Sequence, residues 1–177
     1  IDAPDNGEIA WSSFGVIAKR ADNDASLLPS EPVKVGIGVQ PAQPPFIGDT
    51  VWHDQNRDGI QDPAEPGING VRVELYTDNG DGIADPATDT LYSFTLSSND
   101  GTDDGKYLFA YVPPADYFIA FVMPSGYLPS PADNGSNNLD SDGVGTTIGS
   151  DLVAVTEVTS IVALEIDFSW DQGIYNQ

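Results

Sequence analysis

The stretch DQNRDGIQDPAE, residues 54–65, carries oxygen-bearing side chains at the spacing that a calcium ion requires. In the pattern D-x-[DN]-x-[DN]-G-x5-E, ligands recur at loop positions 1, 3, 5, 7, 9 and 12. Gly59 falls at position 6, where the chain turns sharply and a side chain would obstruct it. Hard oxygen donors without Cys or His favour Ca²⁺ over zinc, so we expect a calcium site rather than a merely solvated acidic loop. The candidate ligands are Asp54, Asn56, Asp58, the carbonyl of Ile60, Asp62 and Glu65.

A second acidic stretch, TDNGDGIADPATD at residues 77–89, follows the same pattern less closely. With Gly82 at position 6, the first and last slots fall on Thr77 and Thr88, and acidic residues flank this frame and can substitute. We predict a second calcium site here, with a solvated hairpin extension as the alternative. The candidate ligands are Asp78, Asn79, Asp81, Asp85 and Asp89.

A third acidic cluster has two candidate locations. One is Asp100 with Asp103 and Asp104, and the other is Asp140 with Asp142. Because DG and ND pairs are also ordinary turn formers, both locations stay open as calcium sites and as simple turns.

Composition limits the classes of protein to which the chain can belong. Among 177 residues, 28 are Asp or Glu and 6 are Lys or Arg, which gives a net charge of −22. Such a surface repels nucleic acid and anionic membranes and attracts cations. Hydrophobic residues make up 40 % of the chain, which is enough to bury one good core and too many for a disordered acidic tail.

Targeting and redox features are few. Cysteine is absent, which excludes disulfides and thiolate metal sites. No apolar run approaches the ~18 residues of a membrane span, and no signal peptide is visible. Since the chain starts at Ile1, we expect a processed product or an excised piece.

Alternating hydrophobic residues predict strands rather than helices. The chain has 18 Gly and 14 Pro, so few windows can hold three helical turns. Val71, Val73 and Leu75 alternate with polar residues, as do later aromatic residues. FIGDTVWH before residue 54 has an extended pattern and Pro66-Gly67 stops a helix after the loop, which argues against an EF-hand or a dockerin. The expected strands lie near 47–52, 71–77, 90–97, 106–112, 116–122, 151–156, 160–168 and 173–176.

These motifs resemble the SdrD B-like domains of bacterial surface adhesins, a branch of the Cna B-type, prealbumin-like sandwiches. The resemblance runs from Phe46 to Tyr175, through GDTVWHDQNRDGIQDPAEPGINGVRVELY, GKYLFAYVPPADYFIAFVMPSGYLPSPADNG, NNLDSDG and DQGIY. It implies an all-β, antiparallel Greek-key β-sandwich of the prealbumin or immunoglobulin type, formed by residues 46–177 with calcium-binding loops. It also implies an extracellular, non-enzymatic module that Ca²⁺ stabilises in an adhesin stalk or surface filament at the cell surface, next to neighbouring domains.

One departure from the family pattern concerns an internal cross-link. Cna B-type relatives often carry a Lys-Asn or Lys-Asp isopeptide bond whose lysine lies on the first strand, and the first strand here has no lysine. Lys106 belongs instead to the GKY motif. We therefore expect no isopeptide bond.

Other functions have weaker support in the sequence. His53 beside Asp54 suggests a catalytic pair, but neighbouring residues on a strand end cannot both face one site. Three Trp, seven Tyr and seven Phe suggest sugar stacking, although aromatic residues that alternate along strands usually form core. A carbohydrate- or protein-binding recognition module remains the alternative function, and an exposed coplanar aromatic row would favour it.

Residues 1–45 precede the resemblance and form a separate segment. Ile9 to Ala18 changes its apolar face at Ser12-Ser13, which predicts a β-bulge, and Val33 to Val39 alternates cleanly. Two isolated strands are marginally stable in water, so another sheet must complete them. They are the tail of an upstream domain, strands donated to another copy of the chain, or strands packed on their own sandwich, and a Pro-rich linker follows them.

Overall fold

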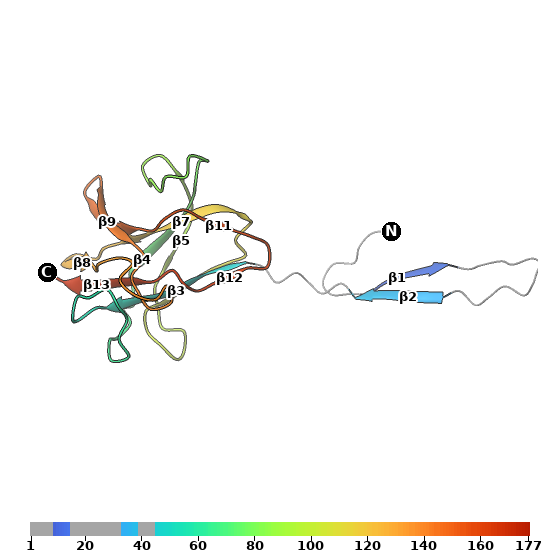
Figure 1. Ribbon diagram of the computed structural model, residues 1–177, viewed down its shortest axis with the longest axis horizontal. Coiled ribbons are helices and arrows are strands. Elements are labelled where there is room, and N and C mark those ends of the chain that lie inside the picture. Colours follow the sequence, from blue (N-terminus) through green and yellow to red (C-terminus); the bar gives the residue numbers. More distant parts are fainter. Residues whose placement is uncertain (1–8, 15–32, 39–44) are drawn as a thin grey trace, which may run out of the picture. The chain divides into compact units, whose positions relative to one another are not determined.

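The computed structural model describes residues 9–14, 33–38 and 45–177, in two compact units, residues 1–43 and 44–177 (Figure 1). In the first unit, β1 (Ile9–Phe14) pairs antiparallel with β2 (Val33–Gly38). The pairing runs without a register shift from Ile9 to Phe14, so the predicted bulge at Ser12-Ser13 is wrong. Backbone ladder bonds hold these strands in register even where the apolar pattern changes face.

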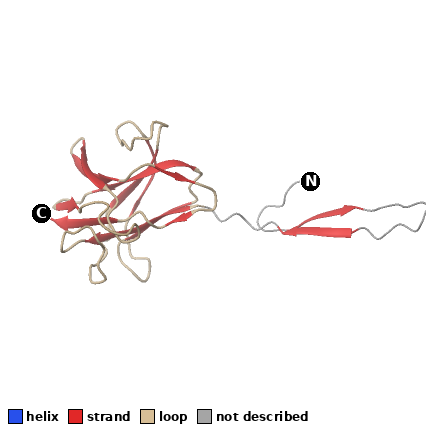
Figure 2. Cartoon of the chain, viewed as in Figure 1, coloured by secondary structure: helices blue, strands red, loops and turns tan. Residues whose placement is uncertain are grey.

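The second unit is a sandwich of two sheets built from strands (Figure 2). The first sheet has the order β5 (Thr90–Leu96), β4 (Arg72–Thr77), β7 (Ala115–Val122), β10 (Asp151–Val155), β9 (Val144–Ile148), and β11 (Thr159–Ile161) also pairs with β7. The second has the order β12 (Ile166–Asp167), β3 (Phe46–His53), β13 (Gln172–Asn176), β8 (Tyr127–Pro129), and β6 (Lys106–Ala110) also pairs with β3.

The predicted all-β sandwich is confirmed, and its second sheet is mixed, with both parallel and antiparallel pairs. β3 pairs parallel with both β12 and β13. Along the sequence, β9, β10 and β11 of the first sheet precede β12 and β13. The chain then crosses to the second sheet and runs beside β3 in the same direction as β3. This crossover places the last strand of the unit next to the first, which matters for the loop that follows β3.

Most predicted strands are confirmed, and the differences have local causes. The predicted strand 160–168 is broken into β11 and β12 by a turn, in which Glu165 N–H donates to Val162 O at 3.3 Å and Leu164 has φ of 71°. Strands β8 and β9 were not predicted. The YLP of β8 contains a proline, and β9 is a glycine- and threonine-rich strand whose side chains are mostly exposed.

The core lies between the two sheets and continues on the outer face of the first. Tyr117, Ile119 and Phe121 of β7 point into the main core, as their alternation predicts. Phe118, on the opposite face of β7, is also fully buried and stacks on Tyr76 with ring centroids 5.2 Å apart. Ala84 and Val158 pack on this second cluster, so the loop after β4 is held against the outer face of the sheet. Within the described residues, no helix is long and apolar enough to cross a membrane.

Candidate metal centre

Asp54 anchors the first loop, because it follows directly after β3 and its side chain is fully buried. Its backbone N–H donates to Ile174 O of β13 at 3.0 Å. Its two carboxylate oxygens accept the N–H groups of Arg57 at 2.5 Å and Gly59 at 2.9 Å. Arg57 and Gly59 both have positive φ, 63° and 77°. The carboxylate therefore holds the backbone in the sharp turn that an ion-binding loop of this type needs.

Glu65 closes the loop from its other end. Its two carboxylate oxygens accept the N–H groups of Gln55 at 2.7 Å and Asp62 at 3.1 Å. Because one side chain bonds to Gln55 and Asp62, the second and ninth loop positions are brought together before any ion is considered. The predicted position 12 thus has the location that the sequence pattern requires.

Three further predicted ligands converge inside this frame. The Asn56 amide nitrogen donates to Asp58 Oδ2 at 2.9 Å and to Asp62 Oδ2 at 3.1 Å. An amide with partial positive charge between two carboxylates lies where a cation would be favoured. In the part of the chain that the structure describes, however, no group of three or more His, Cys, Asp or Glu side chains is close enough to hold a metal ion.

Ile60 connects the first loop to the segment that contains Asp140. The two residues form a backbone bridge, and Ser141 N–H donates to Gly59 O at 2.9 Å. Asn134 of the same segment donates its side-chain N–H to Asp58 O at 2.6 Å. The predicted ligands in loop 54–65 and in the NNLDSDG motif are therefore parts of one packed region rather than separate loops.

The second loop repeats the bonding of the first. Asp78 Oδ2 accepts the N–H groups of Gly80 at 2.8 Å and Gly82 at 3.3 Å, as Asp54 does in the first loop. The carboxylate oxygens of Asp89 accept the N–H groups of Asn79 at 2.9 Å and Asp85 at 3.0 Å, as those of Glu65 do. Of the residues weighed from sequence, Asp78 and Asp89 thus make the contacts that correspond to positions 1 and 12.

Thr77 is instead the last residue of β4 and pairs with Thr90 of β5. Asp81 matches Asp58, since its Oδ1 accepts the N–H of Ile83 at 2.9 Å. The sequence alignment on Gly82 is thus correct in the middle of the loop and shifted by one residue at each end.

The loop between β5 and β6 is bonded as a turn. Asp100 Oδ1 accepts the N–H groups of Thr102 and Asp103, at 2.8 and 2.9 Å. Asp104 Oδ1 accepts the amides of Asn69 and Asn99, at 2.7 and 2.9 Å. Hydrogen bonds to these ionised carboxylates lower the pKa of both, chiefly those from Asp103 to Asp100 and from Asn69 to Asp104.

The predicted Asp142 lies beside an acidic residue that the sequence did not single out. Asp171 N–H donates to Asp142 Oδ2, and Asp171 Oδ1 accepts the N–H of Thr50 at 3.1 Å. Burial raises the pKa of the Asp142 carboxyl to about 7 and that of Asp171 to about 9, where the nearby charge of Asp49 adds to the effect. Asp171 starts the DQGIY motif, and no periodicity marks its burial.

Several acidic oxygens have no partner among the described residues. These buried atoms are Asp78 Oδ1 in the second loop, Asp140 Oδ1 beside the first loop, and Asp171 Oδ2. A buried carboxylate oxygen without a donor is costly unless a proton or a cation satisfies it. Each of these three oxygens is therefore a position where a proton or a cation would be favourable.

Among the described residues, several aromatic side chains and Asp54 bear on the alternative functions considered above. Trp52 and Trp170 are buried in the sandwich, and Tyr111, exposed by 73 %, packs on Phe46 at an angle of 56° rather than in a coplanar row. The Asp54 carboxylate is bonded to backbone N–H groups, away from a catalytic pairing with His53.

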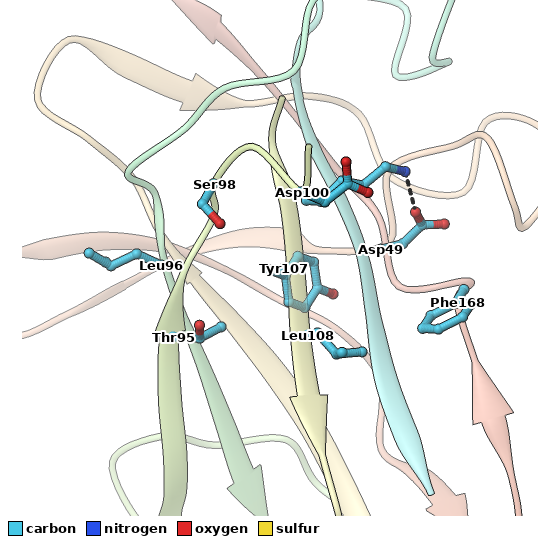
Figure 3. Close-up of a pocket in the computed structure, with 9 residues that line it drawn as sticks. Asp49, Thr95, Leu96, Ser98, Asp100, Tyr107, Leu108 and Phe168 are labelled. Carbon is cyan, nitrogen blue, oxygen red and sulfur yellow. Dashed lines mark hydrogen bonds and ion pairs between the residues drawn. The ribbon is translucent and has the colours of Figure 1, made fainter. Parts of the chain in front are cut away.

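A cleft of about 440 Å³ lies along β5 and β6 (Figure 3). Leu96, Leu108 and Phe168 contribute its half-exposed apolar side chains. At one side, Lys106 Nζ lies 2.9 Å from Asp49 Oδ1, as the dashed line in Figure 3 marks. Lys106 is thus held in an ion pair across β3 and β6, and no histidine lines the cleft.

Comparison with known proteins identifies the family. The profile of the SdrD B-like domain matches residues 46–174. The chain belongs to the SdrD B-like domain family. The chain is similar to part of the serine-aspartate repeat-containing protein F of Staphylococcus epidermidis, with 38 % identity over 149 residues, which cover 83 % of this chain and 8 % of that protein. It is also similar to the serine-aspartate repeat-containing protein D of Staphylococcus aureus strain Newman, with 38 % identity over 102 residues, which cover 57 % of this chain and 7 % of that protein. The chain thus spans less than a tenth of these relatives.

Proposed function

We propose that the SdrD B-like unit is a calcium-stabilised, non-enzymatic structural module of a bacterial cell-surface protein, with the role of a stalk or filament spacer. The observation that carries the proposal is the shared bonding of the two acidic loops. In each, one carboxylate holds the sharp turn and another clamps the loop ends together. In the first loop the Asn56 amide also brings the carboxylates of Asp58 and Asp62 together, and carboxylate oxygens are the ligands that Ca²⁺ prefers.

The chain's own residues have defined tasks in this proposal. In the first loop, Asp54 and Glu65 shape the backbone, while Asp58 and Asp62 direct carboxylate oxygens to the position that the Asn56 amide nitrogen occupies. Bound calcium would supply positive charge that offsets the repulsion among these carboxylates. In the second loop, Asp78, Asn79, Asp81, Asp85 and Asp89 have the corresponding tasks.

The length of the relatives supports the structural part of the proposal. The chain matches a small fraction of these long proteins, as one module among several would. Its two sheets pack on one another around a continuous core. Its high negative charge would keep an extracellular module apart from other anionic surfaces.

Calorimetric titration of the metal-free chain with Ca²⁺ tests the proposal. We expect binding at about 10⁻⁴ to 10⁻³ M, as is typical of extracellular modules, and weaker binding of Mg²⁺. Asp58→Asn should remove one binding event and Asp81→Asn another. Asp151→Asn, on an exposed position of β10, is the matched control that should leave both unchanged. Absence of calcium binding in the unaltered chain would refute the proposal.

A further inference from the structure

The first acidic loop and the last strand are in direct contact. β13 lies parallel to β3, with Ile174 opposite His53, and the loop 54–65 continues from the end of β3 (Figure 1). The ladder between the two strands ends with the bond from Asp54 N–H to Ile174 O at 3.0 Å. Beyond this point, β3 offers no further backbone partner to the last residues of β13.

Arg57 contacts the residues of β13 that lie beyond its pairing with β3. Its Nη2 donates to Asn176 O at 3.0 Å. The guanidinium carbon also lies 4.7 Å from the centroid of the Tyr175 ring, in cation–π contact. On the other side, Tyr175 and Asn176 pair with β8. Arg57 therefore holds these two residues on the side that faces the loop, while β8 and the bond from Gln177 N–H to Gly126 O at 2.9 Å hold the opposite side.

The position of Arg57 depends on the conformation of the loop. Its N–H donates to Asp54 Oδ1 at 2.5 Å, and its φ of 63° lies in the left-handed region, which costs a non-glycine residue free energy unless surrounding contacts hold it. In the second loop the corresponding residue is Gly80, with φ of 100°, which has no side chain. The contact of Arg57 with Tyr175 and Asn176 is thus specific to the loop beside β13, and the ion-binding pattern alone does not require it.

We propose that Arg57 is a positioning residue that couples cation binding in loop 54–65 to the order of β13 and of the residues that follow it. The coupling rests on the proposed function, since it needs an ion in the loop. When the ion holds the loop, Arg57 is held in its left-handed conformation and fixes Tyr175 and Asn176. When the ion leaves, the carboxylates of the loop repel one another, the turn at Arg57 loosens, and the end of β13 frays.

Coupling of this kind is reciprocal, which gives a second consequence. If calcium favours the contact between Arg57 and β13, the contact must favour calcium by the same factor. Replacing Arg57 should therefore weaken calcium binding by about 5-fold or more, although Arg57 contributes no ligand and its positive charge alone would oppose the ion.

The chain lacks cysteine, so Gln177→Cys accepts a single spin label at the end of β13. In the otherwise unaltered protein, we expect the electron paramagnetic resonance spectrum of the label to be mobile in EDTA and restricted in excess calcium. With Arg57→Ala, the label should stay mobile in calcium, whereas Arg57→Lys, which keeps the charge and loses the planar contact, should restore the restriction in part. Arg72→Ala is the matched control, because Arg72 pairs with Glu74 and Phe94 on the first sheet.

Calorimetry on the same samples separates the possible failures. The coupling is overturned, and the proposed function left intact, by either of two results obtained together with calcium binding. One is a label that calcium restricts in Arg57→Ala, and the other is a label in the otherwise unaltered protein whose mobility is the same in EDTA and in calcium. Absence of calcium binding overturns both. Binding with a calcium-dependent label that requires Arg57 but tolerates Arg72→Ala supports the coupling.

Discussion

Removal of calcium should lower the stability of the SdrD B-like unit by an amount set by binding to the folded state. An ion that binds only the folded chain adds RT ln(1 + [L]/Kd), which is about 2.7 kcal/mol at a hundred-fold excess of calcium over the dissociation constant. For a chain of this size, about 1 kcal/mol corresponds to about 2–4 °C in Tm, so one site contributes about 5–11 °C. The smaller Mg²⁺ ion needs a stricter octahedral site and should restore little of this loss.

Two substitutions separate the structural contribution of the loop carboxylates from their contribution to ion binding. Asp54 is fully buried and accepts two backbone N–H groups, so Asp54→Ala leaves two donors without partners, at about 1–3 kcal/mol each, even in EDTA. Asp58→Asn keeps an oxygen that can accept the Ile60 N–H. Asp58→Asn should therefore be nearly neutral in EDTA and lose only the calcium increment of the first loop.

Urea denaturation of the three proteins, followed by far-UV circular dichroism in EDTA, in about 10 mM MgCl₂ and in about 10 mM CaCl₂, measures these differences. The expected pattern is a large calcium increment for the unaltered chain, a smaller one from the second loop alone for Asp58→Asn, and a low midpoint in all three buffers for Asp54→Ala. Equal midpoints in EDTA and calcium for the unaltered chain would refute the reasoning, because the loop would then be complete without an ion.

Three further predictions follow from other contacts. The intact mass should equal the mass of the sequence, because Lys106 forms an ion pair with Asp49 on β3; a mass lower by one water would show that the two have condensed into an amide. In EDTA, the free energy of unfolding should fall as pH rises from about 4 to 9, because burial raises the pKa of Asp171 to about 9 in the folded chain. The protonated carboxyl stabilises the fold fully below the pKa of the unfolded chain, and this contribution is lost as pH rises through the pKa of the folded chain. Asp171→Asn should flatten this dependence in urea melts. Gly82→Ala should cost about 1–2 kcal/mol for its left-handed φ, and Gly59→Ala about 1–3 kcal/mol more, because its Cβ would lie 2.1 Å from Pro131 O while that of Gly82 meets open space; similar urea midpoints for the two variants would contradict this.

The sequence determined the elements whose signals are local. The alternation at residues 71–75 and 116–122 predicted β4 and β7, because a strand repeats its environment every two residues. The spacing of the loop 54–65 likewise predicted where Gly59 turns and where Glu65 closes the loop, since both depend on contacts within a dozen residues.

Only the tertiary structure decided the contacts that join distant segments. The sequence did not indicate that β13 runs parallel to β3, because the pairing depends on where the chain crosses between sheets. Closure of the sandwich then brings Asp171 to Thr50, and Arg57 to Asn176, across more than a hundred residues in each case. The same closure buries Asp171 and raises its pKa. Strand register and burial depend on the whole assembly of strands, so no local pattern encodes them. Acidic residues that look alike in the sequence therefore differ in burial and pKa only once the two sheets pack together.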